Sequence, residues 1–170
     1  RGDSWIGIAY SDGTFLRTEK RAGWITSIFG DQVLVKKIID RTPQMLFGQT
    51  RFPTCGDSTK INAQPYYLRL PQGMLTLGSN GDLYDYDAEC ARQKSLGIKH
   101  ITTNDAEVQL SEIWLSSHDG EMRYHNGIAQ LMRSVPASFA SWLATEDSVD
   151  IFRDTFGNRP LYYMVVGNYF

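Results

Sequence analysis

Asp-Gly and Asn-Gly dipeptides between short extended segments constrain the fold of this chain more than any other feature. They occur at residues 12–13, 80–81 and 119–120. These dipeptides adopt the positive backbone φ angles that two-residue β-hairpin turns require. Apolar and β-branched residues flank each of them, which favours strands on both sides. The sequence therefore predicts a scaffold built largely from antiparallel hairpins.

The remaining segments are predicted from apolar periodicity and from Gly and Pro positions. Strands are expected at residues 5–10, 14–18, 24–29, 32–40, 45–47, 66–70, 74–77, 83–86, 108–115 and 161–166. A mid-chain helix is expected at residues 88–96, and a C-terminal block of three helices between residues 126 and 157. This order predicts an α+β fold with a mostly antiparallel sheet and a final strand inserted between strands already formed.

The length of 170 residues predicts a single domain that spans residues 1–170. A chain of this length buries about two-thirds of its unfolded surface, so it needs neither a metal nor a disulfide to fold. Because the sequence starts at Arg1 rather than Met, we interpret it as a piece excised or processed from a longer chain.

Charge and hydropathy exclude two classes of partner. The chain has 17 basic and 19 acidic residues that are scattered along it, for a net charge of −2. Phosphate contact requires clustered Lys and Arg, so nucleic acid is not expected as a partner. No apolar run approaches the roughly 20 residues that span a bilayer, so this segment is not expected to insert into a membrane.

Two cysteines allow two interpretations. Cys55 lies in the polar loop of residues 51–65, and Cys90 lies in the predicted helix of residues 88–96. They could form one disulfide in an oxidising compartment or remain free thiols in a cytosol. An exposed loop thiol is a liability unless it is paired or reactive. This favours a disulfide and an extracytoplasmic (periplasmic or secreted) location, with a cytoplasmic location as the alternative.

A cysteine nucleophile is the one catalytic arrangement that the sequence permits. Cys55 could be activated by His118 or His125, with Asp119 orienting the imidazole. Asp119 is equally explained as a hairpin turn residue. This combination predicts a small hydrolase, which we keep as an alternative.

Cofactor and metal motifs are weak. Residues 82–89 contain four carboxylates, but their spacing differs from that of an EF-hand and one of them, Asp87, is expected to cap a helix. The histidines and cysteines lack zinc-ligand spacing. The glycines of residues 78–81 lack the Lys-Ser/Thr pair of a phosphate-binding loop. We therefore predict no cofactor and no metal.

Tyrosines on the predicted strands are the best functional signal. In adjacent pairs such as Tyr66 and Tyr67, one side chain must face outward. We expect a site where these tyrosines meet the long loop of residues 51–65, in which Arg51, Asp57 and Lys60 could fix a polar ligand. The resulting prediction is a non-enzymatic module that binds a small polar ligand or a protein partner, as the extracytoplasmic sensing part of a larger bacterial-type receptor or assembly. A structural subunit of an assembly is a further alternative.

Overall fold

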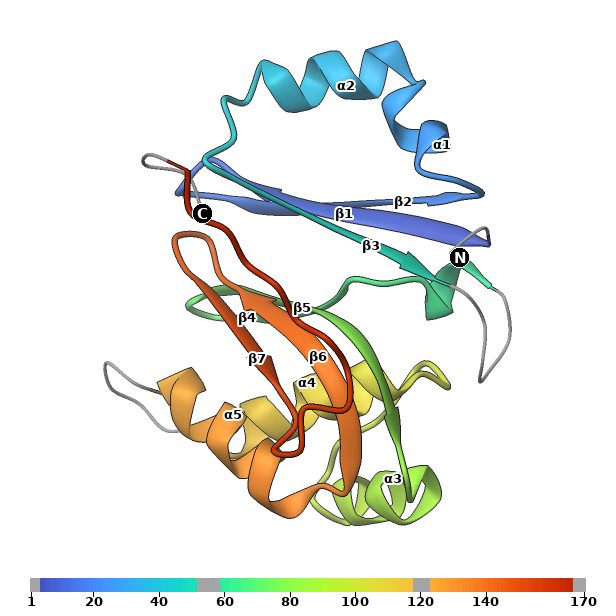
Figure 1. Cartoon of the computed structure of the whole chain (residues 1–170), viewed down its shortest axis with the longest axis vertical. Coiled ribbons are helices and arrows are strands. Elements are labelled where there is room, and N and C mark those ends of the chain that lie inside the picture. Colours follow the sequence, from blue (N-terminus) through green and yellow to red (C-terminus); the bar gives the residue numbers. More distant parts are fainter. Residues whose placement is uncertain (1–3, 52–58, 118–122, 167–170) are drawn as a thin grey trace.

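The computed structural model of the chain describes residues 4–51, 59–117 and 123–166. Two antiparallel sheets pack face to face, and helices cover the outer face of each sheet (Figure 1). This arrangement confirms the predicted α+β fold with antiparallel sheets.

The first sheet contains three strands in the order β2-β1-β3. Its strands are β1 (Trp5–Ser11), β2 (Leu16–Ala22) and β3 (Met45–Arg51). The predicted hairpin between β1 and β2 is confirmed. The Asp12 carboxylate accepts hydrogen bonds from the backbone N–H groups of Thr14 and Phe15, and Gly13 has a φ of 87°.

The second sheet contains four strands in the order β4-β5-β6-β7. Its strands are β4 (Tyr66–Leu70), β5 (Gly73–Leu83), β6 (Ala137–Ala144) and β7 (Val149–Arg153). The strand predicted at residues 66–70 is confirmed as β4, the one predicted at residues 74–77 is part of the longer β5, and the two strands form a hairpin. β4 pairs only with residues Gly73 to Leu77 of β5, whereas β6 pairs as far as Leu83. Beyond Leu77, β5 therefore pairs with a neighbouring strand on one side only, which is the β6 side.

Helices α1 (Thr26–Phe29) and α2 (Gln32–Ile39) cover the first sheet. Helices α4 (Asp105–Leu115) and α5 (Arg123–Ser134) cover the second, and α3 (Tyr86–Ser95) packs beside α4. A short 3₁₀ helix, η1 (Lys60–Asn62), precedes β4. In the described part of the chain, no helix is long and apolar enough to cross a membrane.

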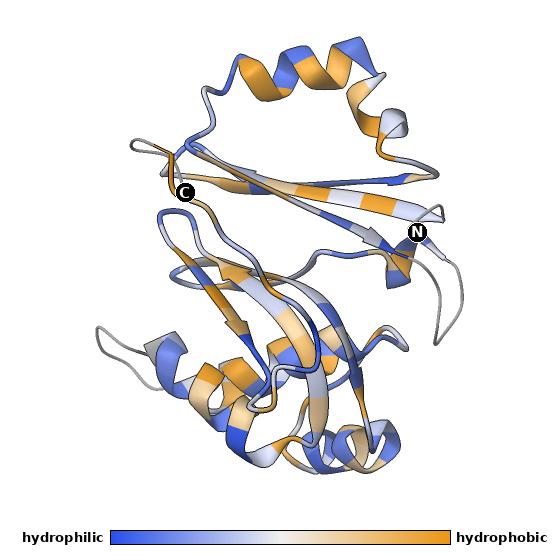
Figure 2. Ribbon diagram, viewed as in Figure 1, coloured by the Kyte–Doolittle hydropathy of each residue, from blue (hydrophilic) through white to orange (hydrophobic). Residues whose placement is uncertain are grey.

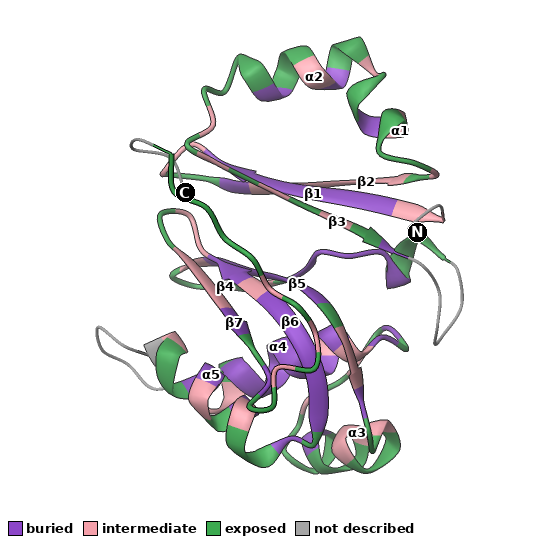
Figure 3. Ribbon diagram, in the orientation of Figure 1, coloured by how far each residue is buried: buried purple, intermediate pink, exposed green. Residues whose placement is uncertain are grey.

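Three apolar clusters hold these layers together. The largest lies between the second sheet and α4 and α5, and Leu75, Leu77 and Ile113 are fully buried in it. Another lies under α1 and α2, and a smaller one between the sheets contains Ala9, Leu16 and Met74. The hydropathy and burial colouring show the same layering, with β1, β6 and α4 buried along most of their length (Figures 2 and 3).

Several strand predictions are wrong because short apolar runs occur in helices as well as in strands. Residues 24–29 and 32–40 form α1 and α2, and residues 108–115 belong to α4. The Asp31 side chain caps α2 by accepting from the Leu34 N–H, and Asn104 caps α4 through Ala106. Leu34 and Ile38, four residues apart, are both buried on one helix face. The capping residues therefore decide the local structure here.

The predicted C-terminal helical block is correct only for α5. Residues 137–144 and 149–153 are strands β6 and β7 instead. β6 is buried on both faces, since Leu143 faces the helices while Trp142 stacks on Phe47 of β3 at 4.9 Å between ring centroids. A strand buried on both faces lacks clear polar alternation, so its sequence can resemble a helix.

Two further predictions are corrected. Asn80 and Gly81 lie inside β5 rather than at a turn, so residues 83–86 do not pair back across them. The expected last strand, residues 161–166, forms no strand; only Val166 makes an isolated bridge. Tyr162 and Tyr163 are 89% and 73% exposed, so this segment is not inserted in a sheet.

Candidate functional site

The edge of β5 beyond the end of β4 is the starting point of the candidate site. The Ser79 N–H donates to the Gln64 side-chain oxygen at 2.6 Å, and the Gln64 side-chain amide donates back to the Ser79 carbonyl at 2.9 Å. Two pairs further along, the Leu83 N–H donates to the Asp105 carboxylate at 2.7 Å. Side chains thus take the place of a neighbouring strand at these two positions.

Gly81 lies midway between these two held positions. Backbone groups of alternate strand residues point to the same edge, so the Gly81 N–H points to the edge that Gln64 and Asp105 occupy. The pairing on the other side agrees, because Phe139 of β6, which is opposite Gly81, directs its own backbone groups to Asp154. Among the described residues, no group accepts a hydrogen bond from the Gly81 N–H. Gly81 is half-buried, so a ligand can reach it.

Arg51 brings a positive charge to this end of the sandwich. It ends β3 opposite Trp5, in a register that points its side chain at the second sheet, and it is only 5% exposed. Its charge acts on the buried hydroxyl of Tyr66, as do the carboxylates of Asp105 and Glu107. Burial raises the pKa of Tyr66 far above its usual range, so this phenol stays neutral. Arg51, Tyr66 and Asp105 are therefore gathered in one region.

Asp105 is held where it is by the start of α4. The preceding residue, Asn104, caps the helix by accepting from the Ala106 N–H at 3.0 Å. Burial raises the pKa of the Asp105 carboxyl, and the nearby charge of Asp82 raises it further, while the hydrogen bond from Leu83 opposes both effects. The carboxylate is half-buried and carries its negative charge close to the open edge of β5.

The loop of residues 62–65 connects both sheets to this region. The ammonium group of Lys20 on β2 donates to the Ala63 carbonyl at 2.5 Å. Burial lowers the pKa of Lys20 to about 8, with a smaller contribution from the charge of Lys60. Asn62 and Thr103 exchange hydrogen bonds at 3.1 and 3.0 Å, which ties the loop to the turn before α4.

These groups together suit a small zwitterion. A buried guanidinium binds a carboxylate through two parallel hydrogen bonds, and a half-buried carboxylate binds an ammonium group. An open backbone N–H on a strand edge can donate to a carbonyl oxygen or to an oxyanion. The region therefore has the donors and acceptors that a free amino acid with a polar side chain requires.

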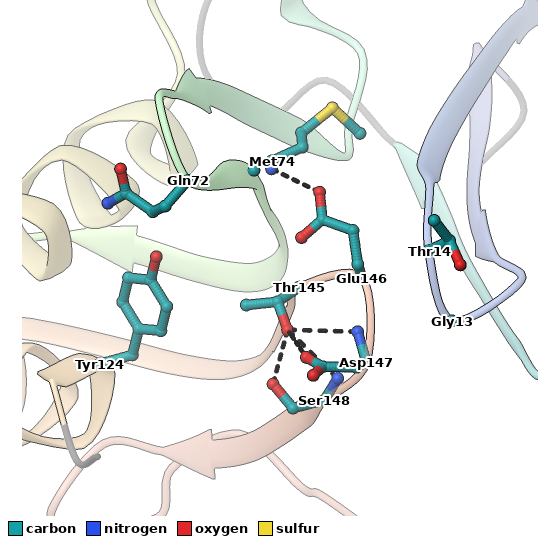
Figure 4. Close-up of a pocket in the computed structure, with 10 residues that line it drawn as sticks. Gly13, Thr14, Gln72, Met74, Tyr124, Thr145, Glu146, Asp147 and Ser148 are labelled. Carbon is teal, nitrogen blue, oxygen red and sulfur yellow. Dashed lines mark hydrogen bonds between the residues drawn. The ribbon is translucent and has the colours of Figure 1, made fainter. Parts of the chain in front are cut away.

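A polar hollow with a volume of about 580 Å³ lies at the opposite end of the sandwich (Figure 4). It lies between the β1–β2, β4–β5 and β6–β7 turns. Here the Glu146 carboxylate accepts from the Met74 N–H at 2.6 Å, and the Thr145 hydroxyl bonds to Asp147 and Ser148. These polar groups bond to one another, which explains the turn without a ligand.

The predicted site residues do not all lie in the region of the candidate site. Arg51 and Tyr66 lie close to each other, but Tyr66 is buried beneath the site and does not line a surface. Tyr67 points to the other face of β4, where Arg69 covers its ring. Lys60 is exposed on η1, close enough to Lys20 to lower its pKa. Asp57 lies outside the described residues.

The predicted cysteine chemistry finds no support. Cys90 is a free thiol on α3, and burial raises its pKa. Cys55, His118 and Asp119 lie outside the described residues, so the Cys55–Cys90 disulfide stays a prediction without support from the structure. His125 bonds to Asp150 of β7 at 2.7 Å.

The acidic segment of residues 82–89 is also used in other ways. Asp82 pairs with Arg159, Asp85 rather than Asp87 caps α3, and Glu89 pairs with Arg92. Within the described ranges, no group of three or more His, Cys, Asp or Glu side chains could hold a metal ion.

Comparison with known proteins assigns the family. Residues 50–170 match the glutamine amidotransferase domain family, so the chain belongs to that family. The chain is 29% identical over 168 residues to the amidophosphoribosyltransferase of Drosophila melanogaster and 30% identical over 169 residues to that of Mus musculus. These alignments cover 95% of the chain but 30% and 32% of the relatives, so the chain spans about a third of their length.

Solved structures agree with this assignment. Glutamine phosphoribosylpyrophosphate (PRPP) amidotransferase from B. subtilis, complexed with ADP and GMP, has a TM-score of 0.82 and 25% identity. That match covers 98% of this chain and 34% of the other. A predicted glutamine amidotransferase from Pseudomonas aeruginosa PA01 shares the fold, with a TM-score of 0.57 and 15% identity over 89% of this chain and 60% of the other.

Family membership overturns the predicted function. The prediction of a non-enzymatic, extracytoplasmic sensor module is wrong, because the chain belongs to the glutamine amidotransferase domain family and its relatives are amidophosphoribosyltransferases. The predicted periplasmic or secreted location depends on the sensor interpretation and on the cysteine pair. Because the sensor interpretation is wrong, only the cysteine pair still favours that location.

Sequence reasoning missed Gly81 and Asp105. The dipeptide Asn80-Gly81 predicts a hairpin turn instead of a strand interior, and no motif in the sequence marks Asp105 as a ligand-binding residue. One signal was available for Asp105, since Asn104-Asp105 precedes an apolar segment with the residue types of a helix start.

Proposed function

We propose that this chain binds L-glutamine at the open edge of β5 and forms the glutamine-binding part of an amidotransferase. The observation that carries the proposal is the convergence of buried Arg51, half-buried Asp105 and the open Gly81 N–H at one end of the sandwich. Membership of the glutamine amidotransferase domain family identifies the amino acid that these groups would bind.

The charges match the two ionised groups of a free amino acid. The Arg51 guanidinium would bind the α-carboxylate, since its planar donors fit two carboxylate oxygens. The Asp105 carboxylate would bind the α-ammonium group. The hydrogen bond from Leu83 fixes this carboxylate through one oxygen, which leaves lone pairs for the ligand.

Gly81 would act on the side-chain amide of glutamine. When a nucleophile adds to that amide carbon, the carbonyl oxygen takes negative charge and needs a fixed donor. The Gly81 N–H is held between two anchored positions of β5, so it would not have to reorganise during the reaction. A Cβ at this position would lie 2.5 Å from the Phe139 Cβ, which favours glycine here.

The relatives support a role in a longer protein. Amidophosphoribosyltransferases and the PRPP amidotransferase are about three times the length of this chain. We propose that the longer protein passes the amide nitrogen of glutamine to a phosphoribosyl acceptor of the kind that these names state. Cys90 is not proposed as the nucleophile, because its raised pKa opposes formation of a thiolate.

Isothermal titration of the chain with L-glutamine tests the proposal directly. Asp105→Asn should weaken glutamine binding by about tenfold, because it removes a charge-assisted bond while retaining an acceptor for the Leu83 N–H. Asp87→Asn, the same change at an exposed position of α3, is the matched control and should bind like the unaltered chain. Failure of the unaltered chain to bind glutamine, or equal binding by Asp105→Asn, would contradict the proposal.

The same titration has an expected pH dependence. Burial raises the pKa of Asp105, so as the pH falls this carboxylate is protonated before an ordinary aspartate. The α-ammonium group of glutamine stays charged throughout that range. Affinity should therefore decline on acidification, starting above the pH at which exposed aspartates titrate, and Asp105→Asn should remove this decline.

A further inference from the structure

We propose that Gln64 is a positioning residue, which holds the edge of β5 so that Gly81 presents its N–H to the glutamine amide. The inference rests on the proposed function, because it concerns the same site. It assigns a role to a buried side chain that would itself not touch the ligand.

The side-chain amide of Gln64 makes the two hydrogen bonds that the backbone of a neighbouring strand residue would make. Its amide is both donor and acceptor, so it exchanges two hydrogen bonds with the backbone of Ser79, at 2.6 and 2.9 Å. β4 starts only at Tyr66 and pairs with β5 no further than Leu77. Gln64, which is 8% exposed, therefore extends the hydrogen-bond ladder by one hydrogen-bonded pair, from Tyr66–Leu77 to Gln64–Ser79, beyond the end of β4.

The backbone of the Gln64 loop is itself fixed from two directions. A Cβ at Gly7 of β1 would lie 1.9 Å from the Gln64 carbonyl oxygen, so the loop packs directly on the first sheet. The Lys20 ammonium group holds the preceding carbonyl, that of Ala63. The Gln64 amide is therefore a rigid support and not a mobile surface side chain.

Ser79 is also held from the helix side. Its hydroxyl donates to Gln109 of α4 at 2.8 Å and accepts from the Ser141 hydroxyl of β6 at 2.8 Å. The side chain of Ser79 is thus fixed independently of Gln64, whereas its backbone edge depends on Gln64. Loss of the Gln64 amide should consequently loosen the edge at residues 79–81 without opening the core.

Two ligands separate positioning from general structural damage. L-norvaline has the α-carboxylate and α-ammonium groups of glutamine but no side-chain amide, so it reports on Arg51 and Asp105 alone. In Gln64→Met, the preference for glutamine over norvaline should fall by about tenfold, the worth of one well-placed hydrogen bond. Norvaline affinity should change by less than twofold, and amide hydrogen exchange at Ser79, whose N–H bonds to Gln64, should become faster.

Gln49→Met is the matched control. The Gln49 amide approaches the same Ser79 carbonyl from β3, but at 3.5 Å and from a half-buried position. This variant should keep both the preference and the exchange rates. An unaltered chain that binds glutamine no better than norvaline would overturn the proposed function. If the unaltered chain prefers glutamine and Gln64→Met retains that preference, only the role of Gln64 is overturned. The same holds if Gln64→Met loses affinity for glutamine and for norvaline equally.

Discussion

The two ends of the sandwich are both polar, yet their polar groups are used differently. At the turn end, Glu146 bonds to Met74, and Thr145 bonds to Asp147 and Ser148. At the other end, buried Arg51 and half-buried Asp105 flank an open N–H of Gly81. One end is satisfied by contacts within and between its turns, and the other offers charge and a donor to a ligand.

This difference shows that a hollow alone does not identify a site. The turn end has a measurable volume of about 580 Å³, but its carboxylate is engaged in holding two turns together. The β5 end is identified by chemistry, because a buried cation, a half-buried anion and the open N–H of Gly81 lie at one end of the sandwich, and burying charge is costly. The kind of polar group present, and not the volume of a hollow, marks the candidate site.

Substitution of Arg51 should produce the largest difference between the two ends. Arg51→Met is expected to reduce glutamine affinity by about 100-fold, because it removes a paired charge contact to the α-carboxylate. Arg51→Lys should recover only part of this loss, since an ammonium group lacks the planar pair of donors. Calorimetric titration with glutamine measures both effects.

Arg69→Met provides the control for Arg51. Arg69 is an exposed arginine on β4 that covers the Tyr67 ring, away from the proposed site. Its loss should leave affinity unchanged. Equal effects of the Arg51 and Arg69 substitutions would mean that net charge, and not a defined site, governs binding.

The local parts of the fold could be predicted from the sequence. The hairpin at Asp12 and Gly13 depends on turn chemistry within four residues, and so does the hairpin at Gln72 and Gly73. The α5 helix was also found. These elements are specified by neighbours in sequence, which is what a single sequence reports well.

The errors occur at short apolar runs, which periodicity alone does not assign to a helix or to a strand. β6 is buried on both faces, so it lacks the polar alternation of a half-buried strand, whereas α2 buries only Leu34 and Ile38 and leaves Val33 and Ile39 exposed. The Asp31 cap of α2 was present in the sequence, but the β-branched residues that follow it favoured a strand. For β6, the deciding contact is Trp142 on Phe47, residues almost a hundred positions apart, which no local pattern contains.

The site could be predicted only in part for the same reason. Arg51 is predicted as a polar residue of the long loop of residues 51–65 and Tyr66 as a strand tyrosine beside that loop, and the structure places the two close to each other. Gly81 and Asp105 depend on strand register, since β4 must end before β5 does and α4 must start beside Leu83. The dipeptide Asn80-Gly81 is a strong turn signal, and only pairing with β6 overrides it.

Lys20 offers a test of burial at the ligand end through pH. Burial lowers its pKa to about 8 from an ordinary value of 10.5, so between these values the unfolded chain binds more protons than the folded chain. The free energy of unfolding should therefore rise with pH across this window, by roughly 1–2 kcal/mol for a partly exposed group. Denaturant unfolding of the chain and of Lys20→Met should show the rise only in the former; parallel curves would mean that Lys20 is not buried.

Glu146 should give the smallest effect on ligand binding and so completes the comparison. Glu146→Ala leaves the Met74 N–H without its acceptor and should lower the free energy of unfolding by about 1–2 kcal/mol, the cost of an unsatisfied buried donor. Glutamine affinity should stay within twofold of the unaltered chain, because Glu146 lies at the opposite end of β5 from Gly81. Thermal unfolding and titration on the same sample measure both quantities. A tenfold loss of affinity with unchanged stability would move the glutamine site to the turn end.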